Sequence, residues 1–301
     1  MKYYVYSESN LSHDTIKEIQ QMEVAAVVRE PVATKVFGNF SANEVDYFIC
    51  PAYFFSVEPS DYVSLVKYLK YFKEKPERHI FFDLCDSQEN SSVLCDSIVF
   101  KISARSGFGF YYPIPNAWCS WIMMEKIPSI KNCVYDVCFQ GAQTHSIRYE
   151  INKIIEICNK NKLKTYLNIQ KLYHYSLDYN ERSISEASYY QSIIDSKFVL
   201  CPRGGSPSSV RIFETLAAGR IPVIISDDLI LPLPDIGWDK FSIRVPEKNA
   251  HNTVFYIKKF LKHNNLEKSS NLAKIIWRKY FCTYGFSLKH FLDKSLKKIY
   301  I

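Results

Sequence analysis

Residues 198–226 read FVLCPRGGSPSSVRIFETLAAGRIPVIIS. A short apolar run at 198–201 leads into a loop rich in glycine and serine. A helical pattern then extends over 209–218 and closes at Gly219, before a second apolar run at 221–226. Two short apolar runs separated by a helix indicate buried parallel strands with a crossover helix, which is the repeating unit of an α/β domain.

The loop between the first strand and the helix is a candidate ligand site. In open parallel sheets, ligands bind beyond the carboxyl ends of the strands. Backbone N–H groups and the dipole at a helix start suit a phosphate group. Ser208 or Ser209 would cap this helix or hydrogen-bond a phosphate oxygen.

Arg211 and Glu214 follow the loop at a spacing of three, which places them on one helix face. An arginine there can make a bidentate contact with a diphosphate, and a glutamate one turn later can accept both ribose hydroxyls. The alternative is an ion pair on a solvated face. The combination of strand, loop, arginine and glutamate favours the functional interpretation.

The rest of the chain repeats the alternation of strand and helix. Apolar runs at 2–7, 24–28, 47–50, 79–83 and 97–101 predict strands of a first sheet. The pattern breaks near Pro113 and resumes with a strand at 135–139, a helix at 147–158, a strand at 163–167 and a helix opened by a capping box at Ser183. We therefore predict two α/β domains, at 1–120 and 121–280, and a C-terminal helix at 281–301.

Composition supports a globular protein. The chain has 301 residues, of which 47% are hydrophobic and 23% charged, enough for two domains with cores of their own. It contains no apolar run near the roughly 18–20 residues that span a bilayer, and its start lacks the pattern of a signal peptide. Nine cysteines without metal-ligand or disulfide spacing fit reduced thiols, so we expect a cytoplasmic protein.

The net charge of +7 is concentrated at the C-terminal end. Residues 258–301 hold 11 Lys and Arg against two acidic residues. Such a tail could bind an anionic membrane surface, on the cytoplasmic face, with Trp277, Tyr280, Phe281 and Phe291 inserting at the interface. The alternative, compatible with the first, is that the last helix packs back on the N-terminal domain. We expect no nucleic acid partner, since only the basic tail would argue for one.

The quoted stretch, continued by LPLPDIGWDKFSIRVPE at 231–247, resembles the signature of exostosin-like glycosyltransferases. Weaker similarities occur at 2–6, 46–51, 78–86 and 136–148. The resemblance implies a GT-B fold, with two Rossmann-like domains facing a central cleft, C-terminal helices and an inverting mechanism. It makes 1–120 the acceptor-binding domain and 121–280 the domain that binds the nucleotide-sugar donor.

The resemblance also assigns site residues. Arg211 would hold the diphosphate and act in catalysis, Glu214 would hold the ribose, and Arg148, after Gly141, would be a second phosphate-side cation. The remaining donor-binding candidates are Gly141 itself and four residues of the glycine- and serine-rich loop, which are Arg203, Ser206, Ser208 and Ser209.

An inverting transfer also needs a general base from the first domain. Asp86 matches the family segment and is the candidate, with Asp83 and Glu89 as alternatives, whereas His79 is expected in the core. The sequence has no Asp-x-Asp motif, so we expect no metal cofactor, and Asp227 with Asp228 fits a turn.

These features predict a metal-independent transferase that moves a sugar from a nucleotide-sugar, expected to be UDP-linked, to an oligosaccharide or glycolipid in cell-surface polysaccharide synthesis. Two alternatives stay open. One is a fucosyltransferase-like enzyme that uses a GDP-sugar, and the other is a non-catalytic protein that binds a nucleotide-sugar or acts as a scaffold.

Overall fold

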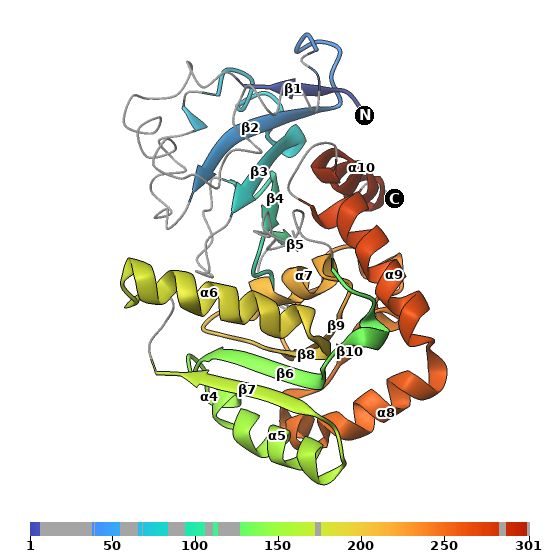
Figure 1. The fold of residues 1–301 in the computed structure, drawn as a ribbon. Helices are drawn as coiled ribbons and strands as arrows, with labels where there is room; N and C mark the ends of the chain where they lie inside the picture. The colour runs from blue at the N-terminus through green and yellow to red at the C-terminus, as the bar shows by residue number, and fades with distance from the viewer. Residues whose placement is uncertain are drawn as a thin grey trace. The chain divides into compact units, whose positions relative to one another are not determined.

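The computed structural model describes residues 1–6, 38, 40–54, 66–67, 69–83, 94–105, 111–113, 127–171, 176–282 and 287–299. The chain divides into two compact units. Unit 1 comprises Met1–Asn116, Ile230–Leu233 and Thr283–Ile301, and unit 2 comprises Ala117–Leu229 and Pro234–Cys282. Each unit contains one five-stranded parallel sheet (Figure 1). The predicted α/β class and the two parallel sheets of the GT-B prediction are confirmed.

The sheet of unit 1 follows the order of the chain, β1-β2-β3-β4-β5. Its central strands are buried on both faces, as continuous apolar runs predict. The strands are β1 (Tyr3–Val5), β2 (Tyr47–Phe54), β3 (His79–Asp83), β4 (Ile98–Lys101) and β5 (Tyr111–Pro113). The predicted strand at 24–28 lies outside the described residues.

His79 belongs to the core of unit 1. Its Nδ1 donates to the Lys75 carbonyl at 2.8 Å, so Nε2 is the acceptor for the Tyr6 hydroxyl at 2.8 Å. Burial lowers the pKa of His79 to about 4. Both ring nitrogens are satisfied in the neutral form, which fits a structural role.

Helix α10 (Ser287–Ile299) is part of unit 1. The Tyr3 hydroxyl donates to Asp293 at 2.6 Å, and the Phe291 ring packs edge-on against Phe100 at 5.7 Å. The apolar stripe of this helix is therefore core, and the prediction that its aromatic residue inserts into a membrane is wrong. The same correction applies in unit 2, where Trp277 and Phe281 are buried.

The sheet of unit 2 has the order β10-β9-β8-β6-β7. After β6 the chain moves outward to β7, then returns to the other side of β6 as β8. The order of the strands thus reverses between β6 and β8, which makes this the topological switch point of a doubly wound sheet. The strands are β6 (Tyr135–Ala142), β7 (Thr165–Gln170), β8 (Ser196–Pro202), β9 (Ile221–Ile225) and β10 (Ile243–Arg244).

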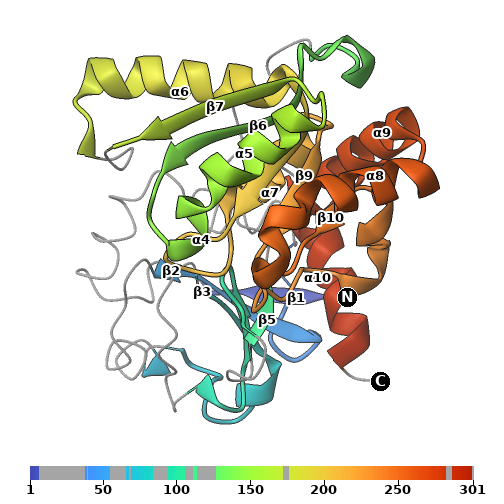
Figure 2. The same cartoon turned by 90° about the horizontal axis from the view of Figure 1, so that it is seen from below.

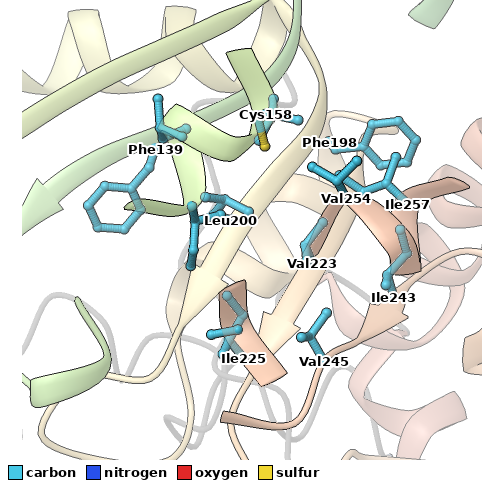
Figure 3. Close-up of a cluster of buried hydrophobic side chains, with 14 of the residues drawn as sticks. Phe139, Cys158, Phe198, Leu200, Val223, Ile225, Ile243, Val245, Val254 and Ile257 are labelled. Atoms are coloured by element: carbon cyan, nitrogen blue, oxygen red, sulfur yellow. The ribbon is translucent and has the colours of Figure 1, made fainter. Parts of the chain in front are cut away.

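Helices cover both faces of this sheet. Helices α5 and α8 pack on one face (Figure 2), and α6 and α7 lie on the other (Figure 1). Figure 3 shows the core under α5 and α8, which includes Phe139, Phe198 and Leu200 of the sheet together with Val254 and Ile257 of α8. The helices are α4 (Ser146–Tyr149), α5 (Ile151–Lys160), α6 (Tyr179–Ile194), α7 (Val210–Ala217), α8 (Thr253–His263) and α9 (Leu266–Ile276). Shorter turns of 3-10 or π helix occupy Pro76–Arg78, Ile130–Asn132, Pro234–Ile236, Trp238–Lys240, Glu247–Asn252 and Trp277–Phe281.

Several element boundaries differ from the sequence prediction. Helix α6 begins at Tyr179, and its N-cap is Asp178, whose carboxylate accepts from the Glu181 N–H at 2.9 Å. The predicted capping box at Ser183 is therefore wrong, because the helix has already begun one turn earlier. The helix predicted at 147–158 is split at Glu150 into α4 and α5. Gly219, at φ +64°, closes α7 as predicted.

The units change close to the predicted domain boundaries. The change near residue 116 falls in a segment outside the described residues, and the second change follows Cys282 rather than residue 280. The assignment of Ile230–Leu233 to unit 1 was not predicted. The Ile230 N–H donates to the Ala104 carbonyl at 3.2 Å, so this short segment pairs with the chain of unit 1.

Two further findings concern only the described part of the chain. No helix there is long and apolar enough to cross a membrane. The seven cysteines described are all free thiols.

Candidate functional site

Most of the predicted donor-binding residues lie at the carboxyl ends of β6 and β8. The loop after β6 leads into α4, and the loop after β8 leads into α7. Because β6 and β8 are neighbours at the switch point, the two loops diverge from adjacent strand ends. This is where open α/β sheets bind their ligands.

Gly141 is the second-last residue of β6, and a side chain there would collide with Arg211. A Cβ at this position would lie 2.8 Å from Nη2 of Arg211. The glycine therefore lets the guanidinium approach the backbone of β6.

Arg211 is only 7% exposed and is held from several sides. Its guanidinium carbon lies 4.6 Å from the centre of the Phe139 ring and 5.3 Å from that of Tyr189. Nη2 donates to the Gln140 carbonyl at 2.5 Å and Nη1 to the Leu200 carbonyl at 3.4 Å. Arg211 thus ties together the ends of β6 and β8.

Glu214 lies one turn further along α7 and is 4% exposed. It accepts a short hydrogen bond from the Tyr189 hydroxyl. Burial raises the pKa of Glu214 to about 7, although the Tyr189 hydrogen bond and the charge of Arg211 both lower it. An exposed Arg211–Glu214 pair on a solvated face is contradicted by these burials.

The guanidinium of Arg211 already faces protein acceptors on all three nitrogens, since Nε donates to the Tyr189 oxygen at 3.3 Å. These hydrogen bonds use three of the five N–H groups of the guanidinium, so a diphosphate would be met by the second N–H of Nη1 or Nη2. The role of Arg211 in holding the diphosphate stays a prediction.

Arg148 and Arg203 connect the two loops. Arg148 donates from Nε to the Arg203 carbonyl at 3.0 Å and from Nη1 to the Ala142 carbonyl at 2.9 Å. Nη1 of Arg203 lies 3.3 Å from Asp228 and 3.9 Å from Glu247. Its Nε is buried without a hydrogen-bond partner. Two cations are therefore fixed at the base of the loops.

The rest of the loop between β8 and α7 offers backbone and hydroxyl groups. A side chain at Gly205 would meet no atom within 4 Å, whereas one at Gly204 would lie 3.2 Å from Nη2 of Arg148. The Ser206 hydroxyl donates to the Ser208 carbonyl at 3.3 Å. Ser209 is the N-cap residue of α7, yet its side chain makes no capping hydrogen bond.

The candidate base is not placed with these groups. Asp86 and Glu89 lie outside the described residues. Asp83 is buried and paired with Lys101 at 2.5 Å at the ends of β3 and β4. Its carboxylate is thereby engaged in an ion pair.

Asp227 and Asp228 follow β9 in a bend of the chain, where Asp227 is paired with Glu247. The Asp227 N–H donates to Glu247, and the Glu247 N–H donates to Asp227, both at 3.0 Å. Within the ranges that the structure describes, no group of three or more His, Cys, Asp or Glu could hold a metal ion.

Sequence reasoning missed Tyr189 and Phe139, which enclose Arg211. The sequence did contain a pattern that places Tyr189 on the buried side of its helix. Tyr189 precedes the buried Ile193 by four residues, so it shares the inner face of α6. A tyrosine on an inner face needs a partner for its hydroxyl, and the nearest helix of the site carries Glu214.

A family model with the description Exostosin GT47 domain matches residues 104–260, slightly more than half of the chain. The chain belongs to the exostosin GT47 family. The match includes β6, β8, α7 and both loops of the site.

Curated relatives of this exostosin-family chain match over a short segment. A probable glucuronosyltransferase of Oryza sativa subsp. japonica is 45% identical over 65 residues, which is 21% of this chain and 15% of that protein. A probable glucuronosyltransferase of Physcomitrium patens is 45% identical over 21% of this chain and 14% of that protein. A probable beta-1,4-xylosyltransferase of Arabidopsis thaliana is 43% identical over 21% of this chain and 16% of that protein. The matches thus span about a seventh of the length of these relatives.

Among solved structures, the crystal structure of TarM superposes on 84% of this chain and 51% of its own, at 14% sequence identity and a TM-score of 0.33. That score is below the level at which a shared fold follows.

Proposed function

We propose that this exostosin-family chain is an inverting, metal-independent glycosyltransferase that moves a sugar from a UDP-sugar to an oligosaccharide or glycolipid acceptor, in the synthesis of a cell-surface polysaccharide. The observation that supports it best is the pair of loops at the switch point. They carry two fixed cations, a glycine with open space beside it and the start of a buried helix.

The chemistry of the transfer suits this arrangement. The acceptor oxygen attacks the anomeric carbon and loses its proton to a base, and the bond from that carbon to the diphosphate breaks. Negative charge then builds on the diphosphate, where Arg148, Arg203 and the N–H groups at the start of α7 would stabilise it. Ser209 could add a hydroxyl donor, since its side chain is not used as a cap.

The base would come from unit 1, and Asp86 stays the candidate from the family resemblance. The relatives are named as glucuronosyl- and xylosyltransferases. UDP-glucuronate and UDP-xylose are therefore the first donors to test.

The test is release of UDP from these donors, measured by chromatography in EDTA, with and without an oligosaccharide mixture as acceptor. We expect release that the acceptor accelerates. Release of GDP from GDP-fucose, with no release of UDP from either UDP-sugar, would favour the fucosyltransferase-like alternative. Binding of a donor without any turnover would favour the non-catalytic alternative. Activity that EDTA abolishes and Mn²⁺ or Mg²⁺ restores would overturn metal independence.

A further inference from the structure

Tyr189 connects two helices of unit 2 through a single hydroxyl group. It lies near the C-terminal end of α6, and its hydroxyl reaches the two charged side chains that α7 buries. The ring also lies beside the Arg211 guanidinium, 5.3 Å from its carbon, and the Phe139 ring is 4.6 Å from the same carbon. One residue from outside α7 thus contacts both members of the Arg-x-x-Glu pair.

The direction of each hydrogen bond follows from the donors present. Arginine can only donate, so Nε of Arg211 donates to the Tyr189 oxygen at 3.3 Å. The single hydroxyl proton of Tyr189 is then free for Oε2 of Glu214. Burial and the adjacent carboxylate keep the pKa of Tyr189 well above its ordinary value, so this proton stays on the tyrosine.

We propose that Tyr189 is a positioning residue of the donor site, whose hydroxyl holds Glu214 as an ionised, oriented acceptor and whose ring holds Arg211 against Phe139. The inference rests on the proposed function, because it assumes that Glu214 receives the ribose of the donor. Nothing in it requires Tyr189 to touch the donor.

The need for such a residue follows from the burial of Glu214. Burial favours the protonated form of the carboxyl. In that form one oxygen carries a proton and donates, so the two oxygens can no longer both accept hydrogen bonds from the two ribose hydroxyls. Among the groups that face Glu214, Tyr189 of α6 and Arg211 of α7 favour the ionised form, and they lower its pKa. The thiol of Cys201, on β8, is neutral because burial raises its pKa to about 12. The tyrosine is therefore a neutral donor that, together with Arg211, holds the pKa of Glu214 down to about 7.

Tyr189→Phe separates the hydroxyl from the ring. It keeps the ring beside Arg211 and removes only the hydrogen bonds. Tyr190→Phe is the matched control, because it removes a hydroxyl from the next residue of the same helix. Circular dichroism and thermal melting check the fold of both variants.

The first measurement is an infrared pH titration of the free protein, with Glu214→Gln identifying the band of this carboxyl. We expect a midpoint near 7 in the wild type and in Tyr190→Phe, since the pKa of Glu214 is about 7. In Tyr189→Phe the midpoint should rise by about one pH unit, because a hydrogen bond to the charged form is lost.

The second measurement is the affinity for UDP as a function of pH, by calorimetry. For Tyr189→Phe we expect about a fivefold loss at pH 7, because a one-unit rise in pKa lowers the ionised fraction of Glu214 from about a half to about a tenth, and this loss recovers as the pH rises. A residue that only packs would weaken binding equally at every pH. Wild-type protein that binds no UDP would overturn the proposed function instead. If the wild type binds UDP and Tyr189→Phe shows the wild-type midpoint and the wild-type pH profile, the role assigned to Tyr189 is wrong.

Discussion

Helix α7 carries two charged side chains into the interior of unit 2, where an unpaired charge costs several kcal/mol. Hydrogen bonds to carbonyls of β6 and β8 and contacts with two aromatic rings offset that cost for Arg211. For Glu214, a hydrogen bond from the Tyr189 hydroxyl does the same. The Arg-x-x-Glu spacing shows in the sequence, but its burial does not, because the groups that surround it come from β6, β8 and α6.

The raised pKa of Glu214 has a consequence for stability. Its folded value of about 7 lies above the ordinary value of 4.5, so the folded state binds this proton more tightly than the unfolded state. The resulting stabilisation is complete below pH 4.5 and is lost as the pH rises to 7.

We therefore predict that Glu214→Gln gains stability relative to the wild type as the pH rises from 4.5 to 7, by about 3 kcal/mol. Urea unfolding at several pH values measures this difference. Glu156→Gln, at an exposed position of α5, is the control and should show no such trend. A constant difference between Glu214→Gln and the wild type over this range would mean that Glu214 titrates normally.

At the scale of elements, the sequence predicted those strands and helices whose signals are local. The helix over 209–218 was placed well, since its glycine stop is encoded beside it. The start of α6 was misplaced, because Ser183 and Glu186 imitate a capping box inside a helix that Asp178 already caps. Asp178 and Ser183 are five residues apart and both are good N-cap residues, so spacing alone does not show at which of them the helix begins.

Helix α8 is the candidate for membrane attachment. Of the aromatic residues first considered for insertion, three are buried and Tyr280 is half-buried. On α8, Phe255 is 63% exposed and shares a face with three exposed lysines. These lysines are Lys258, Lys259 and Lys262. A basic face with one apolar side chain would bind anionic lipid mainly through charge.

We predict binding to vesicles with anionic lipid, no binding to neutral vesicles, and loss of binding at high salt, all measured by sedimentation. Replacing the three lysines of α8 by glutamine should abolish the binding. Replacing Lys67, Lys70 and Lys73 of unit 1 by glutamine removes the same charge elsewhere and should not. Equal sedimentation with anionic and neutral vesicles would rule out this attachment.

At the scale of the whole molecule, the alternation of strands and helices predicted two parallel sheets, and the structure has them. The order of the strands could not be predicted from their order along the chain. β8 pairs with β6 and not with β7, the strand that precedes it in the sequence. That pairing creates the switch point and brings Arg148 to the carbonyl of Arg203 across 55 residues. The return of α10 to unit 1 was one of two alternatives for the C-terminal tail, and its stripe of buried residues accounts for it.

We predict that a nucleotide diphosphate binds against the loop between β8 and α7. Gly205 offers the sharpest probe, since a side chain there would meet no atom within 4 Å and its backbone needs no left-handed conformation. Gly205→Val should therefore fold like the wild type, with stability changed by less than about 0.5 kcal/mol. Its added bulk would nevertheless keep a phosphate from the loop backbone.

The deciding measurement is a calorimetric titration of UDP, in EDTA, into the wild type and Gly205→Val. We predict saturable binding to the wild type and at least a tenfold weaker affinity in the variant, with melting temperatures that agree. Equal affinity in the two proteins would mean that the nucleotide binds elsewhere and that this loop is not the donor site.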